Sequence, residues 1–209
     1  MRVIFSIVCF FSQVCFSAGG GGDWKFGIGL GTSLNYLVAL SGTGVSAGTP
    51  YFTTQTFQHE AATSVALDFR SLNRNSWGMI GGFEYETARA LTKFTANGIN
   101  GTVTSANAFK FQTHFFHIGT AYRWDIFYIP LGLAYGLTKF TPATGATYTG
   151  TAENGMGAYI GMGWYVNDNF VIEYVSRSAT TTLKVVDGAD NETTTGTIGS
   201  ALLGVKYFF

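Results

Sequence analysis

The chain has 209 residues, of which 46% are hydrophobic, 16% aromatic and only 11% charged. Soluble domains carry roughly 25% charged residues, so a water-soluble domain of this composition would be unusual, and the high aromatic content excludes intrinsic disorder. The formal net charge is zero, which gives no reason to expect nucleic acid or an acidic partner.

The first residues have the pattern of a secretory signal peptide. A basic start at Arg2 is followed by an apolar stretch over residues 3–16 and then by the small residues Ser17 and Ala18. This order of basic, apolar and small residues is typical of a cleaved export signal. We therefore predict a signal peptide over residues 1–17, cleaved after Ser17 or alternatively after Ala18, and one domain over residues 18–209.

Both cysteines of the chain lie within the predicted signal peptide. Because Cys9 and Cys15 would be removed with it, the mature protein is expected to have no thiol, no disulfide and no Cys-based metal site. A lipid attached to Cys15 is a weaker alternative, since residues 12–14 lack the usual leucine and small-residue context.

The rest of the sequence alternates between apolar and small or polar residues with a period of two. The apolar face of its first segment carries Trp24, Phe26, Ile28, Leu30, Thr32, Leu34 and Tyr36. A period of two is that of a β-strand with two different faces. The alternation predicts eight strands, over residues 24–36, 60–71, 76–91, 108–123, 126–140, 153–166, 170–183 and 195–209.

The connections between these strands alternate in length. Three are short turns of turn-forming residues, at 73–75, 124–125 and 167–169. The other four are long and rich in Gly, Thr, Ser and Asn, at 38–59, 92–107, 141–152 and 184–194. Short turns on one side and long loops on the other are typical of outer-membrane barrels. We therefore predict an all-β fold, an eight-stranded antiparallel up-and-down transmembrane β-barrel.

Aromatic residues gather at both ends of the predicted strands. All four tryptophans lie at the short-turn ends, and Tyr36, Tyr85, Phe109 and Tyr135 approach the other end. Two aromatic belts at the membrane interfaces are typical of such barrels.

The main alternative is a secreted lipocalin-like barrel, which keeps its apolar face inside and its polar face in water. Here the polar face is mostly Gly, Ala, Ser and Thr. These residues make a poor water-facing surface but suit the crowded interior of a narrow membrane barrel.

The last strand has a distinctive sequence. Ala201, Leu203, Val205, Tyr207 and Phe209 alternate with other residues and end the chain on an aromatic side chain. This pattern is similar to the terminal signal read by the barrel assembly machinery. The mature chain resembles the small eight-stranded outer-membrane barrels of Gram-negative bacteria, the group that includes the OmpA transmembrane domain, OmpX, OmpW and the opacity-type adhesins. The resemblance implies a monomer in the outer membrane, in contact with its lipids and lipopolysaccharide.

Charged residues fall on the inward face of the predicted barrel. Because an eight-stranded lumen is only wide enough for side chains, we expect these charges to pair and close it. A β-bulge at Phe115-Phe116 is predicted, since it would bring both histidines of this strand inside. The predicted network consists of Lys25, Asp68, Arg70, Glu84, Glu86, Lys110, His114, His117, Arg123, Glu173, Arg177 and Lys206.

Four members of this network have residue types that occur in metal and proton-transfer sites, namely Glu84, Glu86, His114 and His117. A lumen network of satisfied charges is the simpler interpretation, so we predict no metal, no cofactor and no catalytic residue.

Two further features have an enzyme-like pattern but lack the residues or the context that catalysis needs. Lipid-modifying barrel enzymes work near the outer rim, where only His59 and Glu60 stand out, without a matching serine. The Gly-x-Ser-x-Gly pattern over residues 44–48 lies in a loop, without the strand–turn–helix context that a nucleophile elbow needs.

These observations predict an outer-membrane barrel with a structural or surface-interaction role, similar to that of an adhesin, and a largely plugged lumen. The four long loops would then meet a host or surface ligand. Two alternatives stay open: a narrow channel for small solutes and, less favoured, a lipid-modifying enzyme.

Overall fold

The computed structural model describes residues 23–102 and 108–209, so the predicted signal peptide lies outside the described residues. Its strands are β1 (Lys25–Ser46), β2 (Thr49–His59), β3 (Ala62–Ser71), β4 (Ser76–Glu86), β5 (Arg89–Ala96), β6 (Ile99–Thr102), β7 (Lys110–Trp124), β8 (Phe127–Thr141), β9 (Thr149–Glu153), β10 (Gly155–Tyr165), β11 (Phe170–Asp187) and β12 (Asp190–Phe208). None of the described residues forms a helix long and apolar enough to cross a membrane.

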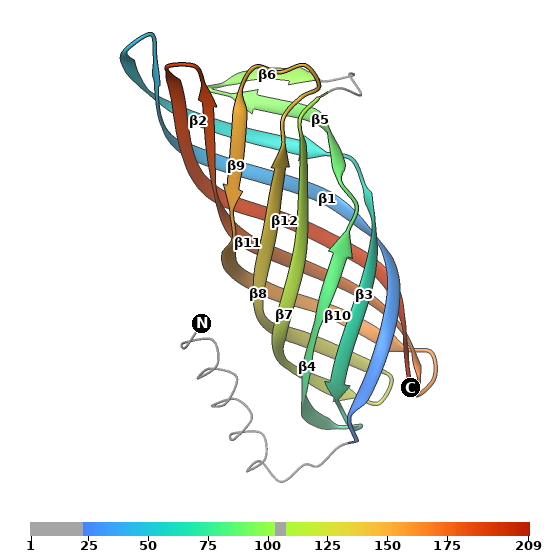
Figure 1. Ribbon diagram of the computed structural model, residues 1–209. Helices are drawn as coiled ribbons and strands as arrows, with labels where there is room; N and C mark the ends of the chain where they lie inside the picture. The colour runs from blue at the N-terminus through green and yellow to red at the C-terminus, as the bar shows by residue number, and fades with distance from the viewer. Residues whose placement is uncertain (1–22, 103–107) are drawn as a thin grey trace.

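Eight of these strands form a closed antiparallel ring. Their order is β12-β11-β10-β8-β7-β4-β3-β1, and β1 pairs again with β12 to close the circle. The closing pair runs from Gly27 opposite Phe208 to Val45 opposite Asn191. The strands wind steeply around a common axis, with short turns at one end (Figure 1). The predicted fold class, an eight-stranded up-and-down barrel, is confirmed.

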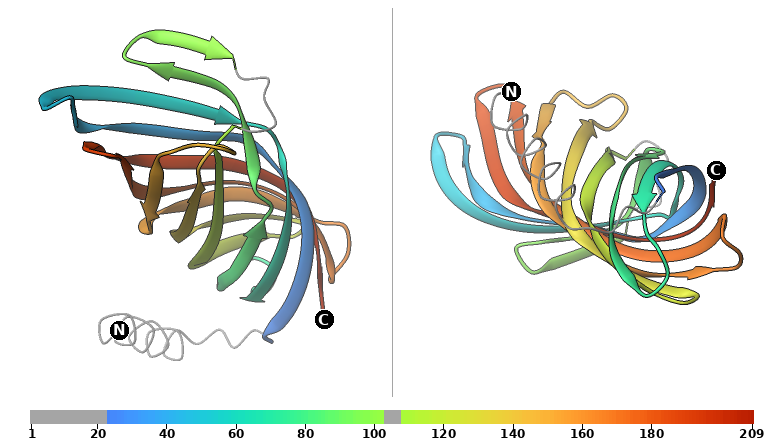
Figure 2. Two further views of the ribbon diagram at one scale, coloured as in Figure 1. Left: turned by 45° about the horizontal axis from the view of Figure 1, so that its top comes forward. Right: turned by 90° about the horizontal axis from the view of Figure 1, so that it is seen from below.

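The long connections are largely β-structure rather than irregular loops. β1 continues beyond the ring into a hairpin with β2, and β5 forms another with β6; both extend past the ring in Figure 2. Ala47-Gly48 and Asn97-Gly98 join these hairpins, and all four residues have positive φ, as two-residue type I′ turns require. The Gly-x-Ser-x-Gly pattern of residues 44–48 therefore ends in a hairpin turn.

The outer face of the ring is apolar and exposed. Phe26, Ile28, Leu30, Leu67 and Leu203 are all about half exposed, which is the arrangement of a lipid-facing band. The tryptophans, also exposed, lie at the ends of the strands that carry the short turns. Such turns face the periplasm in barrels of this kind, so this end is called the periplasmic mouth below.

The aromatic belt at the other end is smaller than predicted. Tyr85 and Tyr135 are exposed on the outer face, but Tyr36 is 1% exposed and turned into the lumen. The ring of Phe109 packs against those of Phe57 and Phe140. Tyr36 and Phe109 are therefore interior residues, and their assignment to the belt is corrected.

The reason for the misplaced Tyr36 is an irregularity in β1. Asn35 has a φ of 50°, and the register with β12 shifts between Leu34 and Leu37. This β-bulge reverses the phase of the strand, so that Ser33 and Tyr36 both point inward. Adjacent strands break at the same height, between β2 and β3 at residues 60–61 and between β4 and β5 at residues 87–88.

The bulge predicted at Phe115-Phe116 is wrong. β7 pairs without a register shift with both β4 and β8 across this position. Phe111 and Phe115 are fully buried, on the same face as His117. The predicted bulge would keep these phenylalanines on the lipid face, whereas they fill the upper lumen.

The assignment of the lipid face predicts the cost of a cation there. Leu30→Arg places a guanidinium on the apolar band, where such a cation costs about 2–4 kcal/mol near the midplane. Ser41→Arg, on the same outward face of β1 but in the extension beyond the ring, should change the free energy of unfolding by less than about 0.5 kcal/mol. Urea unfolding of the refolded barrel in lipid vesicles measures both; equal effects would contradict the assignment.

Candidate functional site

The lumen of the ring is closed by two clusters of buried charges. In the lower cluster, Lys206 Nζ lies 2.6 Å from Asp68 Oδ2 and also pairs with Glu173. His117 Nε2 is 3.4 Å from Asp68 Oδ1, and its ring stacks on Tyr159 at 4.4 Å between centroids. Each of these side chains is at most 7% exposed. Five strands, β3, β7, β10, β11 and β12, thus contribute one side chain each to a single network, because their inward faces meet at the barrel axis.

The upper cluster is built around Arg177. Its guanidinium pairs with both Glu84 and Glu86, and Nε donates to Ser200 Oγ at 3.1 Å. Glu86 also pairs with Arg89. We call the two clusters together the lumen plug, which consists of Asp68, Glu84, Glu86, Arg89, His117, Glu173, Arg177 and Lys206.

Glycines on the inward face make room for these long side chains. A Cβ added at Gly29 would lie 2.8 Å from Lys206 Cγ, and one at Gly82 would lie 2.0 Å from Asp68 Oδ1. Both distances are shorter than van der Waals contact, so a larger residue would displace the ions. The glycine-rich face that is visible in the sequence is therefore the counterpart of the charged residues.

Two members of the predicted network lie outside the lumen. Lys110 is exposed, and the ring of His114 stacks on the exposed Tyr85 at 4.5 Å between centroids. Since β7 has no bulge, His114 and His117 point to opposite faces. The prediction that Glu84, Glu86, His114 and His117 come together in the lumen is therefore wrong, because His114 lies on the outer face. Among the described residues, no group of three His, Cys, Asp or Glu is placed to hold a metal ion.

Arg89 belongs to the plug but was missed by the sequence analysis. A regular strand over residues 76–91 places Arg89 on the lipid face with Tyr85, whereas the break at residues 87–88 turns it inward, fully buried. It lies 4.2 Å from the centroid of the Tyr36 ring. An arginine at a lipid-facing position is costly. The placement of Arg89 on the lipid face by a regular strand is therefore the one sign in the sequence that the strand changes phase before it.

The remaining predicted members lie at the periplasmic mouth rather than in the plug. Lys25 Nζ bonds to Asp168 O and Asn169 Oδ1, and Arg123 Nε donates to Asp125 O. Arg70 is 4% exposed and has no carboxylate partner among the described residues.

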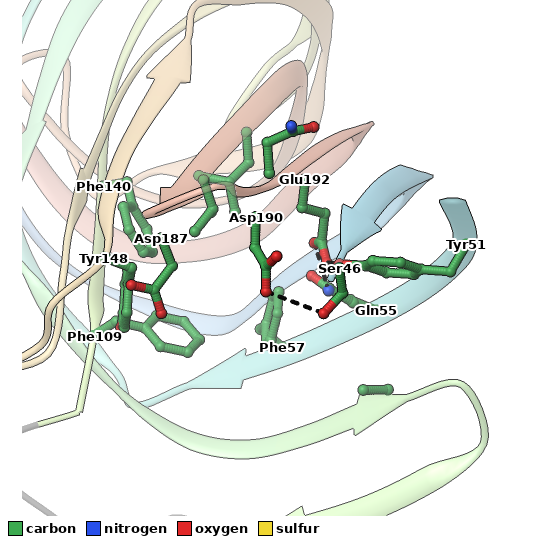
Figure 3. A pocket seen from close by; sticks show the side chains of 14 residues that line it. Ser46, Tyr51, Gln55, Phe57, Phe109, Phe140, Tyr148, Asp187, Asp190 and Glu192 are labelled. Atoms are coloured by element: carbon green, nitrogen blue, oxygen red, sulfur yellow. Dashed lines mark hydrogen bonds between the residues drawn. The ribbon is translucent and has the colours of Figure 1, made fainter. Parts of the chain in front are cut away.

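Above the plug, the upper lumen is apolar and opens into a cup. Phe111, Val38 and Leu40 are buried over the upper cluster. Beyond them lies a cavity of about 350 Å³ whose floor and wall are formed by Phe57, Phe109, Phe140, Tyr148, Leu183 and Val185. These residues come from β2, the segment before β7, β8, the segment before β9, and β11. We call this cavity the extracellular cup; Figure 3 shows it from close by.

The rim of the extracellular cup is acidic. Glu192 accepts hydrogen bonds from Tyr51 Oη at 2.8 Å and Gln55 Nε2 at 2.7 Å. Asp190 accepts from Ser46 Oγ at 3.0 Å (Figure 3), and Asp187 accepts from Thr147 Oγ1. All these donors are neutral, and no Lys or Arg of the described chain forms an ion pair with the three carboxylates. Partial burial and the hydrogen bond to Glu192 raise the pKa of the Tyr51 phenol, which keeps it a donor.

The two residues noted at the outer rim do not act together. His59 is 6% exposed and points inward, with its ring edge-on to Tyr36 and Phe111. Glu60 is exposed on the outside and accepts a hydrogen bond from the backbone of Ala90.

Comparison with solved structures identifies the fold. The outer membrane protein OprG from Pseudomonas aeruginosa superposes with a TM-score of 0.58 at 15% identity, over 91% of this chain and 97% of that one. Outer membrane protein AlkL, determined in lipid bilayers, gives 0.57 at 13% identity, over 92% and 93%. The protein has the fold of the small outer-membrane barrels. No family model and no curated protein matches the sequence of this barrel.

The geometry of the lumen plug predicts strong coupling within the barrel. Arg177→Met leaves Glu84 buried without its cation, so the free energy of unfolding should fall by about 3–5 kcal/mol. Glu84→Gln in the same molecule should recover part of this loss. Lys184→Met is the control, because the Lys184–Glu153 pair is half exposed and such pairs contribute less than about 1 kcal/mol. Additive losses in the double variant, measured by urea unfolding in vesicles, would contradict the pairing.

Proposed function

We propose that this protein is a surface-interaction barrel of the outer membrane that binds an external ligand in its extracellular cup. The observation that supports this proposal most directly is the cup itself, an open cavity of about 350 Å³ with an aromatic wall. Concave, mostly apolar cavities with a few placed polar groups are the usual form of small-molecule sites.

The chemistry of the cup favours a ligand with an apolar body and a cationic group. Phe57, Phe109, Phe140 and Tyr148 offer ring surfaces to an apolar group or to a cation. Asp187, Asp190 and Glu192 add three negative charges that no lysine or arginine neutralises within the described chain. A cation at the rim would complete the hydrogen bonds and charges of these carboxylates.

The lumen plug supports binding at the surface rather than passage through the barrel. Below the cup, apolar side chains and then two layers of paired charges fill the axis, and Glu84, Glu86, Arg89 and Arg177 are at most 1% exposed. A solute that crosses would have to displace several ion pairs at once. The alternative, a narrow channel, requires the plug to move.

Several further expectations belong to the same proposal. Export through a signal peptide over residues 1–17, recognition of the strand ending at Phe209 by the barrel assembly machinery, and contact with lipopolysaccharide are consistent with the fold. The absence of catalysis is proposed as well. It is supported by the separation of His114 from His117 and of His59 from Glu60 described above.

Benzyltrimethylammonium is a suitable probe of the cup, since it combines a phenyl ring with a cation. We expect saturable binding to the refolded barrel, measured by calorimetry. The triple variant Asp187→Asn, Asp190→Asn, Glu192→Gln should bind it about tenfold more weakly, because three exposed charge contacts of about 0.2–1 kcal/mol each are lost. Glu60→Gln, which removes a carboxylate outside the cup, should bind as the wild type does. Unchanged affinity in the triple variant would refute the assigned ligand class.

Planar-bilayer recording separates the surface-interaction role from the channel. The wild-type barrel should show at most brief, small current steps, because the plug closes the lumen. Arg177→Met with Glu84→Gln loosens the upper cluster and should make such steps more frequent. A large and steady current through the unmodified barrel would favour the channel and overturn the proposed function.

A further inference from the structure

The periplasmic mouth contains a second cavity, at the opposite end of the barrel from the cup. It has a volume of about 240 Å³ and lies beside the turns that follow β3 and β10. Four cations and two carboxylates contribute to its lining, namely Lys25, Arg70, Arg74, Arg123, Asp23 and Asp168. Cationic groups therefore outnumber anionic ones, whereas the rim of the cup is acidic.

Arg70 is the most unusual of these residues. Its side chain projects inward from β3 and is 4% exposed, yet Nη1 and Nη2 have no hydrogen-bond partner within residues 23–102 and 108–209. The guanidinium lies 3.4 Å from the centroid of the Phe208 ring and 4.5 Å from that of Tyr165. The two rings contact the faces of the guanidinium, so they cannot accept hydrogen bonds from the N–H groups at its edge. Buried, unpaired donors on a charged group are costly, so this edge lacks an acceptor.

A second guanidinium increases the need for an anion. Arg123 lies 3.5 Å from the centroid of the same Tyr165 ring. Its Nε donates to the Asp125 carbonyl, and Nη2 is 3.6 Å from Asp168 Oδ1. Arg70 and Arg123 thus carry like charges against one aromatic ring, and their repulsion would be relieved by an anion between or beside them.

The other cations of the mouth are only partly neutralised. Lys25 Nζ bonds to two uncharged oxygens, the Asp168 carbonyl at 3.1 Å and Asn169 Oδ1 at 2.9 Å. The Asp168 carboxylate is shared between Arg123 and Arg74, at 3.6 Å from each, and its side chain is 71% exposed. Arg74 Nη1 also lies 3.2 Å from Asp125 Oδ1, and the Asp125 side chain is 67% exposed. Carboxylates as solvated as Asp125 and Asp168 compensate little of the positive charge of the mouth.

We propose that the periplasmic mouth is a binding site for a phosphate-type oxyanion, with Arg70 as its principal ligand. A guanidinium presents two parallel N–H groups that match two oxygens of such an anion. Arg123 and Lys25 supply further charge from neighbouring walls, and the cavity has room for the ion with some of its water. The source is either free phosphate of the periplasm or a phosphate headgroup of the inner leaflet.

Calorimetric titration with inorganic phosphate tests the site in the refolded barrel, held in an uncharged maltoside detergent. The wild type should bind one phosphate per barrel. Arg70→Gln should weaken binding at least tenfold and Lys25→Gln about threefold. Lys184→Gln, which removes a lysine at the extracellular end, is the matched control and should leave the affinity unchanged. No saturable binding by the wild type, or undiminished binding by folded Arg70→Gln, would overturn the proposal.

A second measurement keeps the test decisive if Arg70→Gln does not fold. In the wild-type barrel labelled with ¹⁵N-arginine, phosphate should shift one guanidinium Nε resonance. That resonance is assigned to Arg70 by its loss in Arg70→Lys. The absence of such a shift in the wild type would contradict the site. The source is distinguished in bilayer discs. Weaker phosphate binding in phosphatidylglycerol discs than in uncharged glycolipid discs indicates a lipid headgroup, and equal binding indicates the free ion.

Discussion

Every backbone amide of a membrane-spanning segment needs a partner within the protein, and here the pairing of β1 with β12 meets that need by closing the sheet. Closure with eight strands fixes a lumen that side chains alone can fill. Glycines on inward positions, such as Gly29, then leave room for long ionic side chains such as Lys206. The two open ends of the barrel differ in the sign of their charge, because acidic residues surround the extracellular cup and basic residues surround the periplasmic mouth.

The parts of the fold that follow from strict alternation could be predicted from the sequence. The lower halves of the strands are regular, so a period of two places Asp68, Glu173 and Lys206 on one face, as the structure does. The short turns could be recognised because they consist of turn-forming residues. Nothing else was needed for the fold class, since apolar outward faces of this length suit only a membrane barrel.

The upper half of the barrel could not be predicted in the same way. A bulge or a break between strands has no fixed sequence signature within a period-two alternation. Here three neighbouring strands change phase at one height. Tyr36 and Arg89 were therefore placed on the wrong face, and a bulge was expected in β7, which is regular there. The cup was missed for a further reason: its wall joins residues from distant hairpins, whose pairing depends on the same irregularities.

The bulge at Asn35 also determines how the outer hairpins tolerate changes in length. Above it, Val38 and Leu40 face the interior and Ser41 faces water. Deletion of one residue between Leu34 and Leu37 would exchange these faces along the rest of β1, exposing its apolar side chains to solvent. Insertions or deletions of two residues preserve the phase. Natural or engineered exchange of these hairpins between barrels should therefore succeed only when the change in length is an even number of residues, or when the bulge is transferred with the hairpin.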